Sequence, residues 1–218
     1  VFSSIDHSGR YSYGNQPQIV QWNLARLAET LLPLIDKKQE SAVEMAKEVI
    51  ELYSERFKEY WLSGMRRKIG LFTSEQEDET LIESLLDIMH ENEADFTLTF
   101  RRLSETAFDK KIDINLRNLF KDAGAYEKWS KSWRSRLSRE SGSPEERSKL
   151  MRNVNPAVIP RNHRVEQVLN AAVENSDYGP FEQLVDVLSS PFEEMEYKEE
   201  FMLPPKPGEH VLETFCGT

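Results

Sequence analysis

Apolar residues recur at steps of three and four along most of this chain, and this spacing predicts an all-α fold. The first such stretch covers residues 19–35, and Pro17 just before it suits the first turn of a helix. Its main apolar face comprises Val20, Leu24, Leu27, Leu31 and Leu34. Trp22 adds apolar surface on another side, so we expect burial on more than one face and a kink or stop at Pro33.

A second stretch, residues 41–68, carries apolar and aromatic positions in alternating steps of three and four, as in a coiled-coil seam. The seam comprises Val43, Ala46, Ile50, Tyr53, Phe57 and Tyr60. Three cations at 66–68 suit the C-terminal end of a helix, where the helix dipole favours positive charge. Together the two stretches predict an antiparallel helix hairpin.

Shorter helices are predicted in the middle of the chain, each behind a polar cap. Ser74 opens an acidic stretch and is expected to cap the first of them. Asp95 is expected to cap the next, which should turn Phe100 inward and place Arg101 and Arg102 in water.

The last helices are bounded by turn signals. A Ser- and Gly-containing loop at 141–146 is expected to cap one helix. Pro156 and Pro160 then break the chain into an extended piece. A helical apolar face over 165–173 follows, and a turn at 177–180 leads into a final helix.

These patterns predict three parts. Residues 1–16 form an irregular segment that would pack on an upstream part of the protein, residues 17–190 a helical domain, and residues 191–218 an extended acidic and proline-rich tail. The first residue is not methionine, so we expect the chain to begin inside a longer protein.

The composition narrows the possible partners. A formal net charge of -10 argues against a general binder of nucleic acid or anionic membrane, since both are polyanions. No apolar run approaches the roughly 20 residues that span a bilayer. A single cysteine, Cys216, rules out an internal disulfide and fits a reducing, cytoplasmic location.

Motifs for catalysis are missing from this sequence. It has no glycine loop ahead of a Lys-Ser or Lys-Thr pair for phosphates, no clustered metal ligands and no glycine-flanked nucleophile. We therefore predict no catalytic, cofactor-binding or metal-binding residue. Trp129 and Trp133, among many cations, could stack on single-stranded nucleic acid, but tryptophans in a core are favoured because the chain is acidic.

Polar residues near the start are candidates for an architectural role. Arg10 and Tyr11 follow a glycine in a loop that is rich in aromatic residues. A buried arginine needs a carboxylate or carbonyls, so Arg10 is expected to pair with an acid, either Asp6 or one upstream. Asn15 is a further candidate, as a cap for the helix behind Pro17.

A dense polar group at 161–164 is the other candidate. Asn162 and His163 lie just behind Pro160, between two arginines. The group could bind an anion, or it could form a turn in which Asn162 caps the next helix; we favour the cap.

Taken in order, these motifs resemble the selenoprotein O family, whose bacterial members are called YdiU. The matching segments are Asp6-x-x-Gly9-Arg10-Tyr11, Asn15-Gln16-Pro17 with residues 22–28, residues 94–97 with 100–104, Asn155-Pro156 with Arg161-Asn162-His163, and Phe215-Cys216-Gly217-Thr218. Each motif is weak alone, but their common order from Asp6 to Thr218 is fairly specific.

The resemblance implies a kinase-like (pseudokinase) fold that transfers AMP from ATP to Ser, Thr or Tyr hydroxyls of proteins, with Mg or Mn. The family's phosphate- and metal-binding residues precede the Gly-Arg-Tyr motif, and none maps onto this chain. It would then be the helical C-terminal part of an adenylyltransferase, inactive by itself, with the upstream kinase-like lobe and protein substrates as partners. The family also implies a redox role for Cys216, through pairing with an upstream cysteine.

The alternative from another class is a non-catalytic helical module for protein interactions. The sequence upstream of Val1 distinguishes the two. A lysine-bearing strand region and an Asn…Asp metal pair there would support the adenylyltransferase.

Overall fold

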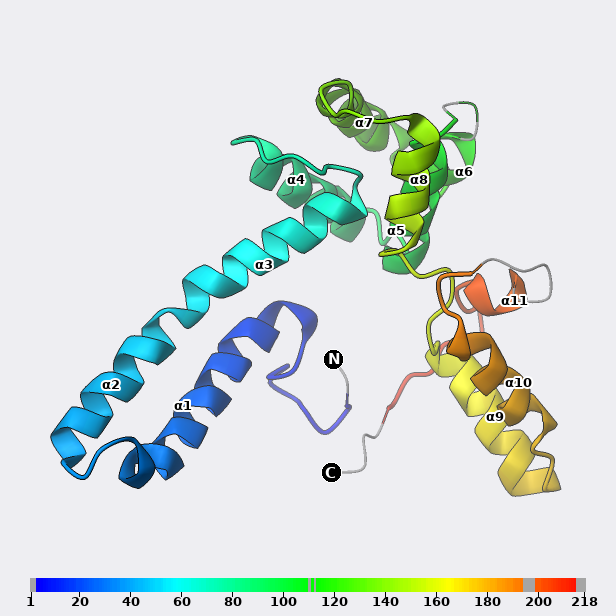
Figure 1. Cartoon of the computed structure of the whole chain (residues 1–218). Helices are drawn as coiled ribbons and strands as arrows, with labels where there is room; N and C mark the ends of the chain where they lie inside the picture. Colours follow the sequence, from blue (N-terminus) through cyan, green and yellow to red (C-terminus); the bar gives the residue numbers. More distant parts are fainter. Residues whose placement is uncertain (1–2, 110, 112, 194–198, 215–218) are drawn as a thin grey trace. The chain divides into compact units, whose positions relative to one another are not determined.

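The computed structural model describes residues 3–109, 111, 113–193 and 199–214, and the regular structure within them is helical (Figure 1). The predicted all-α fold is confirmed. The chain forms two compact units. We call Val1–Leu62 with Leu212–Thr218 the N-terminal unit, and Ser63–Val211 the central unit.

The N-terminal unit is built on a helix hairpin. Its elements are η1 (Tyr13–Asn15), α1 (Gln16–Ile35), α2 (Gln39–Glu51) and the first part of α3 (Tyr53–Lys68), which ends in the central unit. Helices α1 and α2 lie side by side, as predicted (Figure 1). The Gln21 side chain donates a hydrogen bond from Nε2 to the Ile50 carbonyl at 3.5 Å.

Two details of this hairpin differ from the prediction. Pro33 lies inside α1, which continues to Ile35. The second stretch is two helices rather than one, because the chain is interrupted at Leu52, whose backbone N–H donates to the carbonyl of Ile50.

The apolar face of α1 is exposed, so the expected burial on more than one face is wrong for this chain. Exposed fractions along Val20, Leu24, Leu27, Leu31 and Leu34 run from 37% to 82%. The side of α1 that is partly buried carries Gln21, Ala25, Ala28 and Leu32 instead. Helix α2 covers that neighbouring side, which leaves the leucine row facing water.

The central unit holds the remaining helices. They are α4 (Asp78–Glu91), α5 (Phe96–Thr106), α6 (Asp113–Arg117), α7 (Ala123–Leu137), α8 (Pro144–Arg152), α9 (Asn162–Asn175), α10 (Gly179–Ser189) and α11 (Glu199–Met202). Asp95 caps α5 by accepting from Leu98 N, as predicted. The loop at 141–146 caps α8 as predicted, and the structure shows that it does so by a capping box between Ser143 and Glu146. Ser74 is not a cap, since α4 begins only at Asp78.

Trp129 and Trp133 form the middle of this unit's core. Their rings stack with centroids 5.5 Å apart, and both are buried. Trp129 Nε1 donates to the Leu81 carbonyl at 2.9 Å, and Trp133 Nε1 to the Ile69 carbonyl at 2.8 Å. Their faces are therefore unavailable for stacking on bases, and the core interpretation is confirmed.

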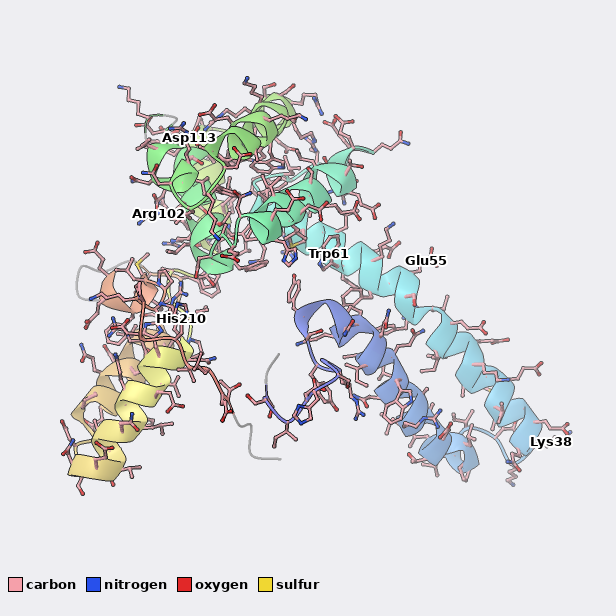
Figure 2. All side chains as sticks on the ribbon, turned by 180° about the vertical axis from the view of Figure 1, so that it is seen from behind. Lys38, Glu55, Trp61, Arg102, Asp113 and His210 are labelled. Atoms are coloured by element: carbon pink, nitrogen blue, oxygen red, sulfur yellow. The ribbon has the colours of Figure 1, made fainter. Side chains whose placement is uncertain are left out.

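Arg101 is buried, at 1% exposure, although we expected it in water. Its Nη1 donates to the carbonyls of Asn155, at 2.9 Å, and Arg152, at 3.2 Å. Arg102, labelled in Figure 2, stays nearer the surface as expected and pairs with Glu105 at 3.0 Å. Arg101 is held inside because it closes free carbonyls behind α8.

Helices α9 and α10 form a second hairpin, drawn in yellow and orange in Figure 1. Its inner side packs on Ala157 and Val158 and on Phe201 and Met202 of α11. The glutamate- and proline-rich tail thus contains a helical turn with two buried side chains, which its composition did not predict.

Candidate functional site

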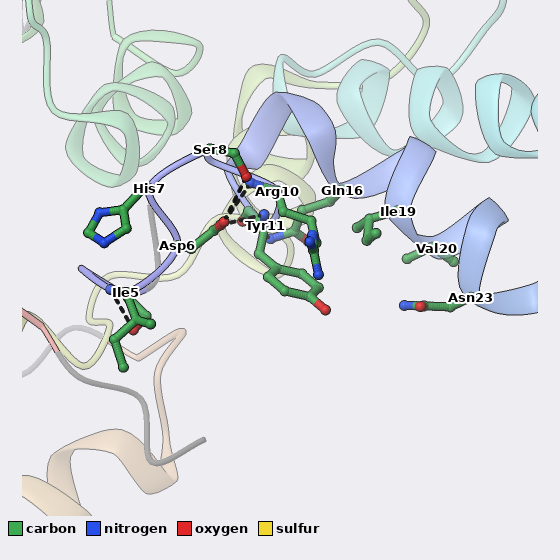
Figure 3. A pocket seen from close by; sticks show the side chains of 11 residues that line it. Ile5, Asp6, His7, Ser8, Arg10, Tyr11, Gln16, Ile19, Val20 and Asn23 are labelled. Carbon is green, nitrogen blue, oxygen red and sulfur yellow. Dashed lines mark hydrogen bonds between the residues drawn. The ribbon is translucent and has the colours of Figure 1, made fainter.

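The loop ahead of α1 and the first turns of α1 line an open groove of about 770 Å³ within the N-terminal unit (Figure 3). Asp6, Arg10 and Tyr11 line it from the loop, and Val20 and Asn23 line it from α1. The structure thus brings together three of the residues that the sequence singled out.

Asp6 organises this loop through its carboxylate. Oδ1 accepts from the Arg10 backbone N–H at 2.9 Å and Oδ2 from the Tyr11 backbone N–H at 2.8 Å (Figure 3). The bonds from Tyr11 and Arg10 hold the pKa of Asp6 below its usual value, because they stabilise the charged form. Asp6 therefore fixes the backbone of the Gly-Arg-Tyr motif.

Gly9 and Asn15 complete the turn into α1. Gly9 has φ +64°, a left-handed conformation that glycine adopts without strain. The Asn15 side chain donates from Nδ2 to the Gly9 carbonyl at 2.9 Å. Asn15 precedes α1 but makes no side-chain cap bond there, so the predicted cap is wrong. Its amide closes the loop instead.

Arg10 and Tyr11 are exposed at the groove. Asp6, one possible partner of Arg10, accepts instead from the backbone N–H groups of Arg10 and Tyr11. The pairing of Arg10 with an upstream acid stays a prediction. Chemically, the groove offers a cation, a phenol and His7, groups that suit polar recognition.

The tail is joined to this loop by two hydrogen bonds. Ser4 N donates to the Thr214 carbonyl at 2.7 Å, and Thr214 N donates to Ser4 Oγ at 3.0 Å. Both residues belong to the N-terminal unit. Cys216, the redox candidate, lies outside the described residues.

Asn162 and His163 lie apart from this loop in sequence and belong to the central unit. Asn162 is the first residue of α9 and Arg161 the residue before it, so the predicted cap by Asn162 is wrong by one position. Arg161 fixes that helix start, donating to Asp95 at 2.8 and 3.1 Å and to the Met202 carbonyl at 2.7 Å. His163 is buried, and burial lowers its pKa, which favours the neutral ring.

The sequence analysis missed a buried ionic cluster in the central unit. Arg136, at 1% exposure, donates from Nε to Asp78 at 2.7 Å and from Nη1 to Glu140 at 2.7 Å. Arg66 binds the other Asp78 oxygen at 2.7 Å. A signal was present: Arg136 follows Trp133 by three residues, which places it on the helix face that the tryptophans bury.

This cluster predicts acid-sensitive stability. Burial alone would raise the pKa of Asp78 and of Glu140, but hydrogen bonds, from Arg136 to Asp78 and from Thr73 and Arg136 to Glu140, outweigh it and lower both. The unfolded-state pKa values are about 3.9 for Asp and about 4.3 for Glu, and the folded-state values lie below them. The cluster therefore contributes its full stability above the unfolded-state values and loses it as the pH falls through the folded-state values. We expect the urea concentration at the unfolding midpoint, measured from pH 7 to pH 3, to decrease as the pH falls below about 4. A midpoint independent of pH would contradict this.

Two features bear on the class of site. In residues 3–109, 111, 113–193 and 199–214, no group of three or more His, Cys, Asp or Glu side chains is arranged to hold a metal ion. Within the same ranges, no helix has both the length and the apolar content of a bilayer span.

Comparison with known proteins identifies the family. The sequence model described as "Protein adenylyltransferase SelO" matches residues 1–189, through the last residue of α10. The chain belongs to the SelO family. The resemblance to selenoprotein O seen in the Gly-Arg-Tyr loop is thereby confirmed.

The relatives that it matches are bacterial proteins named "Protein nucleotidyltransferase YdiU". Those of Rhizobium rhizogenes and Rhizobium etli are each 54% identical over 218 residues, all of this chain and 43% and 44% of theirs. That of Bradyrhizobium diazoefficiens is 50% identical over the same span, 44% of its length. The chain thus spans less than half the length of these relatives.

Proposed function

We propose that this chain is the C-terminal helical part of a protein adenylyltransferase that transfers AMP from ATP to Ser, Thr or Tyr hydroxyls of proteins. The transfer uses Mg or Mn, and its catalytic residues lie in the part of the SelO relatives that this chain does not cover. This chain's own work is to support that part. Membership of the SelO family and the names of the YdiU relatives support the proposal.

One observation carries the supporting role: one side of the α1–α2 hairpin is apolar and exposed. We call it the α1–α2 face. It comprises Val20, Leu24, Leu27, Leu31 and Leu34 of α1, Met45 and Val49 of α2, and Leu52, the residue that follows α2. An exposed row of this length on a helix is typical of a surface that another element covers.

The two rows of this face lie on the same side of the hairpin. On α1 the exposed row precedes the side turned to α2 by about 100°, one residue step. On α2 the exposed row precedes the side turned to α1 by a similar angle. Because the helices are antiparallel, equal offsets bring both rows to one side, where they form a continuous apolar surface.

The occupant that we propose for this surface is the remaining part of the same polypeptide, the kinase-like lobe. The relatives have more than half of their length outside the matched segment, and a segment of that length is large enough to cover the α1–α2 face. Val20 belongs both to the α1–α2 face and to the lining of the groove. A lobe on this face would therefore also reach Arg10 and Tyr11.

The activity is tested with the full-length protein and ATP that is labelled on either the α- or the γ-phosphate. We expect label from α-labelled ATP to appear on protein when Mg or Mn is present, and mass spectrometry to place AMP on Ser, Thr or Tyr. Incorporation from γ-labelled ATP alone would show phosphoryl transfer and contradict the proposal.

A further inference from the structure

The α9–α10 hairpin carries a second exposed apolar surface, in the central unit. It comprises Leu169 and Val173 of α9, Tyr178 in the turn, and Phe181 and Val185 of α10, which are 47% to 82% exposed. We call it the α9–α10 face. Neither the ionic cluster nor the groove at Asp6 includes any of these residues.

This face is distinct from the side of the hairpin that folds onto the unit's core. Val168, Leu184 and Val187 are buried with Phe201 and Met202 of α11. Leu169 and Val185 each follow a buried residue by one step, about 100° further around the helix. On each helix the exposed apolar row therefore lies beside the buried row, and Tyr178 lies in the turn that joins the two helices.

Beyond Arg164 in the first turn of α9, the charged residues of this hairpin are all acidic. From residue 165 to residue 193 the sequence contains no Lys or Arg, and its acidic residues are Glu166, Glu174, Asp177, Glu182, Asp186 and Glu193. The α1–α2 hairpin differs, since it carries both signs: Lys37, Lys38 and Lys47 lie among the acids of α2 and the turn before it. The α9–α10 face is thus an apolar strip with an acidic border.

We propose that the α9–α10 face is a docking surface for a basic amphipathic segment of a partner protein. The partner's apolar row would pack on Phe181 and Val185, and its Lys or Arg side chains would meet the acidic border. The same border repels anionic lipid and nucleic acid. It also disfavours a second copy of this hairpin, because two identical acidic borders would meet. The proposal does not depend on nucleotide transfer.

The test uses the full-length protein and, as the probe, a fluorescein-labelled synthetic peptide of about 18 residues with leucine at helical spacing and lysine elsewhere. Fluorescence anisotropy should show binding that weakens as salt rises from about 50 to about 300 mM. The double variant Glu182→Lys with Asp186→Lys should weaken binding by about tenfold or more, and so should Phe181→Ser.

A matched control is available in α2. Glu44→Lys with Glu48→Lys changes two exposed acids at the same spacing, with the same change in net charge, on the other hairpin. It should leave the affinity for the basic peptide within about twofold. Far-UV circular dichroism confirms that each variant keeps its helices.

Four outcomes would overturn the proposal. The first is no binding of the basic peptide at low salt, and the second is that the α2 control weakens binding as much as the α10 double variant does. The third is that a leucine–glutamate peptide or phosphatidylserine vesicles bind as tightly as the basic peptide. The fourth is a dimer in analytical sedimentation that Phe181→Ser disrupts. The last would assign the face to a second copy.

Discussion

Replacing Arg136 by methionine is expected to destabilise the central unit by about 3–5 kcal/mol. Methionine keeps much of the volume but removes the guanidinium, which leaves Asp78 and Glu140 buried with one fewer cation. An uncompensated buried carboxylate costs much more than the pair contributes. Urea unfolding followed by tryptophan fluorescence measures the change, because Trp129 and Trp133 lie on the same helix.

Arg139→Met is the matched control for this substitution. Arg139 lies just beyond α7 and pairs with Glu77, which is exposed, and with Glu75, which is partly buried and also meets Arg136 at 3.2 Å. Arg139 itself is exposed, so water screens its ion pairs. Its loss should lower the free energy of unfolding far less than the loss of Arg136. Equal effects of the two variants would show that the cluster around Asp78 does not hold the unit together.

Placing a charge on the α1–α2 face is expected to reduce nucleotide transfer by the full-length protein by about tenfold or more. Leu31→Asp puts a carboxylate where we propose that the catalytic part packs, and burying an unpaired charge costs several kcal/mol. In this chain alone the residue is exposed, so the helices themselves should be unaffected. Label from α-labelled ATP measures the activity.

Gln18→Asp is the control, because Gln18 is exposed on the far side of α1 from the leucine row. It adds the same charge to the same helix and should keep near-normal activity. If Leu31→Asp were equally active, the α1–α2 face would not be the surface on which the catalytic part packs.

The helices could be predicted because their signals are local. The leucine row of α1, the capping box at Ser143 and the cap at Asp95 each depend on residues within a turn or two. The same local rules cannot say what covers a face. The row on α1 was therefore identified correctly as apolar and assigned wrongly to the interior of this chain.

The buried charges were missed for a different reason. Arg101 and Arg136 are charged, and a polar pattern places such residues in water. Their partners are remote in sequence, 54 residues away at Asn155 and 58 at Asp78. The helical spacing of apolar residues does not reveal contacts between residues so far apart in sequence. The three-residue spacing from Trp133 to Arg136 did indicate that Arg136 lies on a buried helix face.

The candidate site was predicted in part. Asp6 was named only as a possible ion-pair partner of Arg10, whereas its carboxylate accepts from the backbone N–H groups of Arg10 and Tyr11. Whether Asp6 binds backbone N–H groups or the Arg10 guanidinium depends on the backbone conformation of the loop, including the left-handed conformation of Gly9. A sequence pattern does not contain that geometry.

The central claim is that these helices support nucleotide transfer whose reacting groups lie elsewhere in the polypeptide. It is tested most directly by incubating α-labelled ATP and Mg or Mn with this chain alone, with the remaining part alone, and with the two mixed. We expect no AMP on protein with the isolated chain and restored transfer in the mixture. Transfer of AMP by the isolated chain would contradict the account.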